Sequence, residues 1–143
     1  YGAVDGIISA HKEELKGKVL IDITNPVNFD TFDSLVVPAD SSAAAEIQKK
    51  LPDTFVVKAF NTTFAATLVS GLVGDKEKTT VLLASDSEEA KKKVEGALEG
   101  SPLAVKDAGS LKRARELEAM GFLQITLAAR GQFGWTDGFA VIG

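Results

Sequence analysis

The chain lacks cysteine entirely, and His, Met, Trp and Tyr each occur only once in its 143 residues. The absence of cysteine excludes disulfides, thiolate metal sites and a cysteine nucleophile. No apolar run approaches the roughly 18 residues that a membrane span needs, and no stretch has the pattern of a signal peptide. A net charge of −4 argues against nucleic acid or an anionic membrane as the main partner. We therefore expect a cytoplasmic protein with neither of these partners.

Two further absences concern catalysis. No Gly-x-Gly-x-x-Gly motif occurs anywhere, and nothing resembles a catalytic triad or a cluster of metal ligands. His11 is placed on the polar side of a predicted helix, and the carboxylates of Glu13 and Glu14 point apart because adjacent helix positions diverge. We therefore predict no catalytic acid, base or metal ligand. If the protein is an enzyme, a cofactor carries the chemistry.

Two β-branched apolar runs, Val19–Ile23 and Thr54–Phe60, each stop at a polar tip that disfavours a helix. Short runs of this kind are typical of buried strands in a parallel sheet. Asn25 and Asn61 follow the two runs. Because ligands of open α/β sheets bind at the carboxyl ends of the strands, both asparagines are candidate site residues.

The remaining pattern alternates helices with strands. Apolar spacing and polar caps predict helices over Val4–Leu15, from Ser41 or Ser42 to Leu51, over Phe64–Gly71, from Asp86 or Ser87 to Gly100, and from Ser110 to Arg130. Two more strands are predicted at Thr79–Ala84 and Leu103–Ala108. This indicates one α/β domain, 1–143, with a mostly parallel sheet. The link between the second and third strands is short for a crossover, so one strand can run antiparallel.

Polar motifs at the predicted strand ends each have a structural and a functional interpretation. Asn25, which precedes Pro26, either forms a turn that ends its strand or contacts a ligand at the mouth of the sheet. Lys58 either snorkels near an edge or meets an anionic ligand. The segment Asp107-Ala108-Gly109-Ser110 either caps the next helix or presents that helix N-terminus to an anion.

The last predicted helix separates into charged and apolar positions. We expect the charged side chains to form a solvated face: Lys112, Arg113, Arg115, Glu116 and Glu118. We expect the apolar side chains to belong to the core or to a partner interface: Met120, Phe122, Leu123, Ile125 and Leu127. On the preceding helix, Glu88 and Lys92 have a spacing that favours an ion pair.

Five segments, taken in order and spacing, resemble the coenzyme F420-dependent NADP oxidoreductases and the nucleotide-binding unit of the STEAP metalloreductases. They are Tyr1-Gly2-Ala3-Val4, Lys18 to Pro26, Ser42-Ala43-Ala44, Val56 to Thr62, and Asp107 to Leu111 with Ala114-Arg115 and Leu117-Glu118. The resemblance covers nearly the whole chain. It implies a Rossmann-like oxidoreductase that transfers hydride between NADP(H) and coenzyme F420 or a flavin.

The resemblance also implies where the cofactors bind. Thr24, Asn25 and Pro26 would line the nicotinamide ribose, and the segment from Asn61 to Ala65, which includes Thr62, would lie between the nicotinamide and the second cofactor. Gly138 and the neighbouring Phe139 would approach the deazaflavin. Catalysis would then depend on positioning two cofactor rings and not on an essential acid or base.

Members of this family begin with a strand and a Gly-rich turn that holds the pyrophosphate. This chain begins after that half, so we expect a C-terminal portion that lacks roughly 70 or more residues of a mononucleotide-binding unit. We expect such a portion to be weakly active or inactive alone. It would also expose an edge of Val19–Ile23, and an open apolar edge invites pairing, so we expect a homo-oligomer.

Two other hypotheses stay open. A Rossmann half can survive as a non-catalytic interaction or assembly module. A response-regulator-like domain is a further α/β alternative, but it needs clustered acidic residues after the first strand. This chain has Ile23-Thr24-Asn25 there, which disfavours that alternative.

Overall fold

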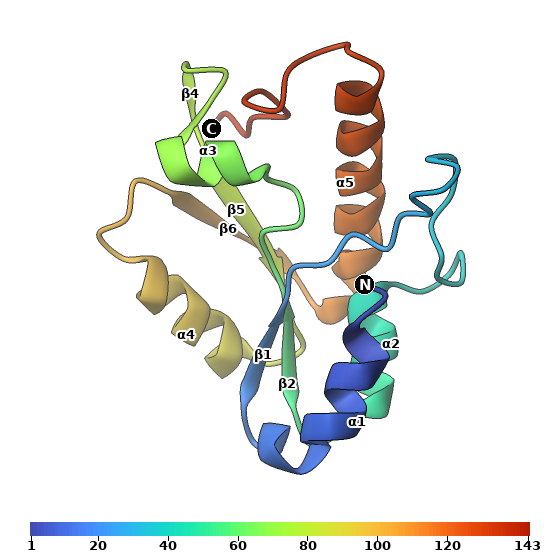
Figure 1. The fold of residues 1–143 in the computed structure, drawn as a ribbon. Coiled ribbons are helices and arrows are strands. Elements are labelled where there is room, and N and C mark those ends of the chain that lie inside the picture. Colours follow the sequence, from blue (N-terminus) through green and yellow to red (C-terminus); the bar gives the residue numbers. More distant parts are fainter.

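The computed structural model describes all 143 residues and has an α/β architecture (Figure 1). Its helices are α1 (Val4–Leu15), α2 (Ala43–Lys50), α3 (Ala65–Ser70), α4 (Glu88–Leu98), the 3₁₀ turn η1 (Leu111–Arg113) and α5 (Ala114–Ala129). Its strands are β1 (Val19–Asp22), β2 (Phe55–Lys58), β3 (Leu72–Val73), β4 (Glu77–Lys78), β5 (Thr80–Ala84) and β6 (Ala104–Gly109). The predicted elements therefore form, with small shifts at their ends. None of the helices combines the length and apolar character of a membrane span.

The main sheet has the order β1-β2-β5-β6 and consists of two parallel pairs. The pairs join through one antiparallel pairing, between Lys58 at the end of β2 and Ala84 at the end of β5. The expectation of one antiparallel relationship is confirmed, because only α3 and the β3–β4 hairpin separate β2 from β5. As a result, the carboxyl ends of both parallel pairs meet in the middle of the molecule (Figure 1).

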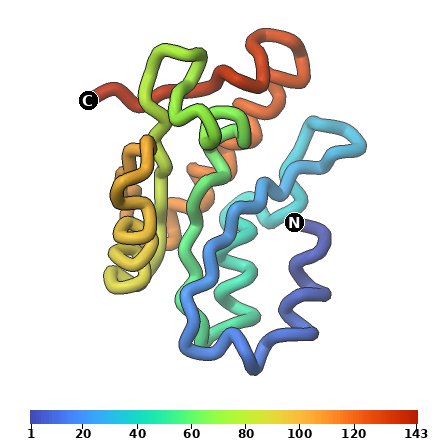
Figure 2. The backbone as a smooth tube through the Cα atoms, turned by 60° about the vertical axis from the view of Figure 1, so that its left-hand side comes forward, coloured from blue at the N-terminus to red at the C-terminus, as the bar shows by residue number.

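Apolar side chains cover both faces of the sheet. Val56 packs in a cluster with residues of α1 and α2, such as Ile8 and Ile47. Its neighbour Val57 packs in a second cluster with residues of β5 and α4, such as Val94. Neighbouring strand residues point to opposite faces, so β2 is buried on both sides and α4 lies opposite α1 and α2 (Figure 2).

Two of the predicted helix caps are confirmed and one is wrong. Ser42 Oγ accepts from the Ala45 N–H, and Ser87 Oγ accepts from the Ala90 N–H. Ser110 makes no side-chain cap. The Asp86 carboxylate instead accepts from the Leu111 N–H at 3.0 Å, and the chain forms η1 before α5 begins.

The C-terminal tail returns across the β3–β4 hairpin (Figure 2). Trp135 packs on Phe64 with ring centroids 5.0 Å apart, and the Gly74 N–H donates to the Thr136 carbonyl at 2.9 Å. The sequence predicted a turn at Gly74-Asp75 but not the two short strands beside it. These contacts bring the tail to the same side of the molecule as α3.

Candidate functional site

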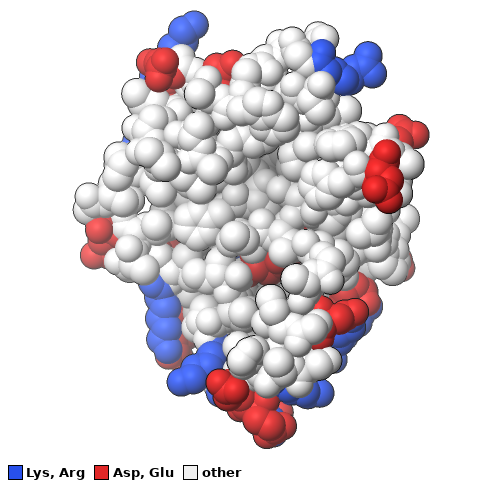
Figure 3. All heavy atoms as spheres, in the orientation of Figure 1, with Lys and Arg blue, Asp and Glu red and all other residues white.

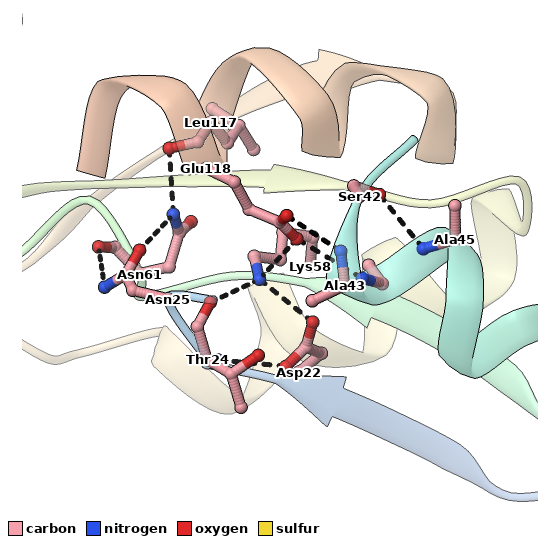
Figure 4. A network of polar contacts seen from close by, with 11 residues as sticks. Asp22, Thr24, Asn25, Ser42, Ala43, Ala45, Lys58, Asn61, Leu117 and Glu118 are labelled. Carbon is pink, nitrogen blue, oxygen red and sulfur yellow. Dashed lines mark hydrogen bonds and ion pairs between the residues drawn. The ribbon is translucent and has the colours of Figure 1, made fainter. Parts of the chain in front are cut away.

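Asn25 and Asn61 lie in direct contact at the ends of β1 and β2 (Figure 4). Asn25 Nδ2 donates to the Asn61 carbonyl at 3.0 Å, and Asn61 Nδ2 donates to Asn25 Oδ1 at 3.1 Å. Asn61 Nδ2 also donates to the Leu117 carbonyl of α5 at 2.8 Å. The two predicted site residues therefore come together, and they bind the strand ends to α5.

Unused hydrogen-bonding capacity remains beside this pair. Thr24 Oγ1 and Asn61 Oδ1 are buried oxygens without a hydrogen-bond partner in the chain. The residue before Asn61, Phe60, has a left-handed backbone with φ of +65°, which costs about 1–3 kcal/mol for a residue with a side chain. Strained backbone and unpaired buried oxygens concentrate at functional sites, so both observations make the strand ends the candidate site.

Lys58 is buried and lies at the centre of a charge cluster next to the asparagines (Figure 4). Its Nζ lies 2.9 Å from Asp22 Oδ2 and 2.9 Å from Glu118 Oε1, and it donates to the Thr24 carbonyl. The interpretation as an edge or snorkelling lysine is wrong, and in this chain its anionic partners are internal carboxylates. Through the Thr24 carbonyl, Lys58 also holds the backbone that leads into Asn25.

Glu118 belongs to the same cluster, and the prediction that it lies on a solvated face is wrong. Its carboxylate accepts from the Ala43 and Ala44 N–H groups at 2.8 and 3.2 Å, at the N-terminus of α2. Burial raises the pKa of Glu118, while Lys58 and these N–H donors act in the opposite direction. The carboxylate thus joins α5 to β2 and α2 at one point.

Gln124 of α5 connects the strand ends with the C-terminal tail. Its Nε2 donates to the Thr62 carbonyl at 3.0 Å, and its Oε1 accepts from the Phe139 N–H at 2.8 Å. Gly138 has φ of +138°, and a Cβ there would lie 2.6 Å from Gln124 Oε1. Gln124 therefore links the Gly138-Phe139 segment to the Thr62 segment. The sequence did not reveal this linking side chain.

The surface above the strand ends is hollowed and largely uncharged. Figure 3 shows a depression between the positions of α3 and α5, with most Lys, Arg, Asp and Glu side chains around the rim. A second hollow of about 330 Å³ adjoins Asn25 and is lined by Tyr1, Gly2 and Val36 among others. Of the other predicted site residues, Pro26 is buried and Ala65 is exposed. These surfaces suit an uncharged, flat ligand group better than a highly charged one.

Other predicted features lie away from this site. Asp107 pairs with Lys91 at 2.8 Å, and the Lys91 ammonium lowers the pKa of the Asp107 carboxyl. Lys91 also takes Glu88 as a partner, so the expected pair between Glu88 and Lys92 is replaced. The Asp107 carboxylate is therefore occupied by Lys91 and by the Gly109 N–H. His11 is exposed beside Glu14, as expected, and no group of three or more His, Asp or Glu side chains is arranged to hold a metal ion.

The five apolar residues of α5 that the sequence assigned to the core or an interface are not core residues in this chain, whereas Ala114, Leu117 and Ala128 are. Gly121, Gln124 and Ala128 are buried, whereas Leu123 is exposed and the other apolar members are partly exposed: Met120, Phe122, Ile125 and Leu127. The interface alternative for these residues stays a prediction. Gly121 packs closely against the asparagines, since a Cβ there would lie 3.0 Å from Asn61 Nδ2 and from the Asn61 carbonyl oxygen.

Three residues of the site, Glu118, Gly121 and Gln124, were missed from the sequence. They recur at spacing three along α5, which places them on one helix face. The signal that could have found them is Lys58, because a lysine inside a buried strand needs an acidic partner elsewhere. Glu118 is the acidic residue on that helix face that pairs with Lys58. Gly121 and Gln124, on the same face, were then the residues to expect in contact with the strand ends.

No family model matches the chain. A relative from Methanocaldococcus jannaschii named "F420-dependent NADP reductase" is 33% identical over 120 residues, which cover 81% of this chain and 53% of the relative. A solved structure from Arthrobacter sp. FB24, assigned as an F420-dependent NADP reductase, matches 99% of this chain with a TM-score of 0.85 and 27% identity. The chain is similar to F420-dependent NADP reductases over most of its length.

This similarity agrees with the resemblance seen in the sequence. The chain spans about half of the length of the Methanocaldococcus relative, 53%, and 66% of the Arthrobacter protein. A hypothetical protein from Sinorhizobium meliloti shares the fold over 76% of this chain, with a TM-score of 0.63 at 23% identity. The Rossmann-like α/β fold with a mostly parallel sheet is therefore confirmed.

Proposed function

We propose that this chain provides the surfaces that hold the nicotinamide and the deazaflavin in an enzyme transferring hydride between NADP(H) and coenzyme F420. The supporting observation is that Asn25, Asn61 and the tail at Gly138 converge at the carboxyl ends of β1 and β2. Open α/β sheets bind their ligands at this place. The relatives' names specify F420 and not a flavin, which favours F420 as the second cofactor.

The nicotinamide side of NADP fits Thr24, Asn25 and Pro26. The hollow beside Asn25 has room for a ribose, and Asn25 itself lines it. Bound NADP supplies the hydride donor or acceptor. The chain's own part is to keep the strand ends rigid: Lys58 holds the Thr24 carbonyl, and the two asparagine amides hold each other.

The segment from Asn61 to Ala65 and the tail at Gly138 would form the boundary between the two cofactor sites. Thr62 is buried with its carbonyl held by Gln124, and Ala65 is exposed with a small side chain that admits a close approach. The ionisable side chains next to the asparagines, those of Lys58, Asp22 and Glu118, are engaged with one another and are not free to act as an acid or base. The rate would come from holding two rings in register and from excluding water.

The decisive experiment measures hydride transfer by the intact protein from NADPH to F420, with flavin mononucleotide as the alternative acceptor. Asn61→Ala removes an amide that holds both Asn25 and the Leu117 carbonyl of α5, so we expect the Kd for NADPH to rise about tenfold, which equals about 1.4 kcal/mol. Gln132→Ala, which removes an exposed amide beyond α5, is the matched control and should leave this Kd unchanged.

The outcomes separate the hypotheses. Reduction of F420 together with the Asn61 effect supports the proposal, whereas reduction of the flavin alone would replace F420 as the acceptor. If the intact protein binds no nicotinamide nucleotide, the proposal fails and the interaction-module hypothesis takes its place.

A further inference from the structure

Gln124 is the only side chain that hydrogen-bonds to both the end of β2 and the C-terminal tail. It is 2% exposed and uses its donor on the Thr62 carbonyl and its acceptor on the Phe139 N–H. Both partners are backbone groups, so the two bonds fix chain positions and not side-chain conformations. A buried amide with both ends used is costly to disturb, because either partner would be left unsatisfied.

The tail is shaped to accept this side chain. Gly138 packs directly against the Gln124 amide, since a Cβ on Gly138 would lie 2.6 Å from Oε1 and 3.0 Å from Cδ of Gln124. Its φ of +138° also favours glycine. Farther from Gln124, the tail is held by the packing of Trp135 on Phe64 and by the hydrogen bond from the Gly74 N–H to the Thr136 carbonyl.

We propose that Gln124 is a positioning residue that sets the separation between the Thr62 segment and the Gly138-Phe139 segment, and hence between the two cofactor rings. This inference rests on the proposed function, because only then do the two segments face different cofactors. A neutral amide is suited to this role, since leucine offers neither bond and an ionised glutamate offers no donor to the Thr62 carbonyl. We call the two hydrogen bonds from Gln124 to Thr62 and Phe139 the clamp. Because a misplacement of about 1 Å can cost 10²-fold in rate, the clamp matters for kcat.

The clamp itself is tested by amide hydrogen exchange of Phe139 in intact protein carrying isotope-labelled phenylalanine, without cofactor. We expect Gln124→Leu to speed exchange at Phe139 about fivefold to tenfold, the effect of losing one hydrogen bond. Gln124→Glu keeps an oxygen toward the Phe139 N–H and should retain most of the protection. Gln132→Leu, the same change at an exposed position, is the control and should leave the exchange rate unchanged.

Gly138→Ala tests the clamp from the tail side if Gln124→Leu fails to fold. Its Cβ would displace the Gln124 amide, so exchange at Phe139 should again accelerate while α5 keeps its sequence. Equal loss of protection in Gln124→Leu and Gln124→Glu, or no loss in Gln124→Leu and Gly138→Ala, would overturn the clamp.

The positioning role is tested by kinetics of the same intact variants. With both cofactors saturating, Gln124→Leu should lower kcat about tenfold or more, while the KM for NADPH changes much less, because the Thr24 and Asn25 contacts remain. A changed exchange rate with an unchanged kcat would overturn the positioning role. A changed exchange rate in a protein that transfers no hydride in any variant would leave the clamp standing and overturn the proposed function.

Discussion

Lys58 Nζ lies 2.9 Å from Glu118 Oε1, and both side chains are almost completely buried. The same ammonium lies 2.9 Å from Asp22 Oδ2, so one cation serves two carboxylates from β1 and α5. Since Glu118 also accepts two backbone N–H groups of α2, four elements meet at this point. The cluster is therefore the main connection between the strand ends and the helix that carries Gln124.

Removing the Lys58 charge should destabilise the fold strongly. Lys58→Met keeps the apolar stem but leaves the Asp22 and Glu118 carboxylates buried without their cation, which typically costs about 3–5 kcal/mol. Urea unfolding measures the loss. Lys49→Met is the control, because Lys49 is exposed and pairs only with Glu46 on the same helix, so its loss should stay within about 1 kcal/mol. Equal stability of the two variants would show that the cluster contributes nothing net.

The pair between Lys91 and Asp107 should give the protein an acid-sensitive contribution to stability. Lys91 lowers the pKa of Asp107 below the ordinary value of 3.8, so the unfolded state binds the proton more readily than the folded state. The stabilisation is then present above the unfolded pKa and is lost as the pH falls through the lowered folded pKa. Asp107→Asn should therefore be less stable than the wild type at neutral pH, and the difference should shrink in acid.

The measurement is the free energy of unfolding of both proteins across this acid range. Asp33→Asn, a change in the exposed loop after β1, is the control and should show no such convergence. A difference that stays constant with pH would mean that Asp107 titrates alike in the folded and unfolded states.

The local features of this fold could be predicted from the sequence. Apolar runs located the main strands. Each of the caps Ser42 and Ser87 was one of two neighbouring candidates, because a capping side chain bonds three residues along the chain. The short link after β2 predicted the antiparallel pairing. Each of these features depends on neighbours in sequence, which local rules describe well.

Long-range polar partners could not be predicted in the same way. Glu118 looks like one more charge on a helix face until folding brings Lys58 against it. Ser110 makes no side-chain cap, and the Leu111 N–H donates to Asp86, which follows β5 and is 25 residues away in sequence. Gln124 gave no signal of its own, since both of its partners are backbone groups far away in sequence, and only its place on the same helix face as Glu118 could have indicated it. The candidate site is built from such contacts. The sequence pattern pointed only to asparagines that follow a strand, and Gly138 was named from the family resemblance alone.

Gly121 should be intolerant of even one added methyl group. A Cβ there would contact Asn61 Nδ2 and the Asn61 carbonyl at 3.0 Å and would also press on Asn25, so Gly121→Ala must push the asparagine pair away from α5. We expect a loss of about 1–3 kcal/mol, the usual cost of overpacking. Weaker NADPH binding should accompany it, measured by titration of the intact protein.

Gly96 supplies the matched control for this prediction. It also lies within a helix, α4, but a Cβ there would meet nothing within 4 Å. Gly96→Ala should therefore stabilise the protein by about 0.5–1 kcal/mol, because alanine loses less backbone freedom on folding. Equal effects at the two glycines would contradict the close contact between α5 and the asparagines.

The open edge of the sheet should make the 143-residue chain self-associate when it is produced alone. β1 is an edge strand, Ile21 and Ile23 are 40% and 61% exposed, and an apolar groove of about 150 Å³ runs between β1 and α1. Unpaired backbone groups beside exposed isoleucines favour pairing with another chain, whereas a lysine on an edge strand opposes it. Light scattering should therefore find a homo-oligomer that Ile23→Lys shifts toward monomer. Val69→Lys, at an exposed apolar position of α3, should not have this effect. A monodisperse wild-type monomer would show that the edge is protected without a partner.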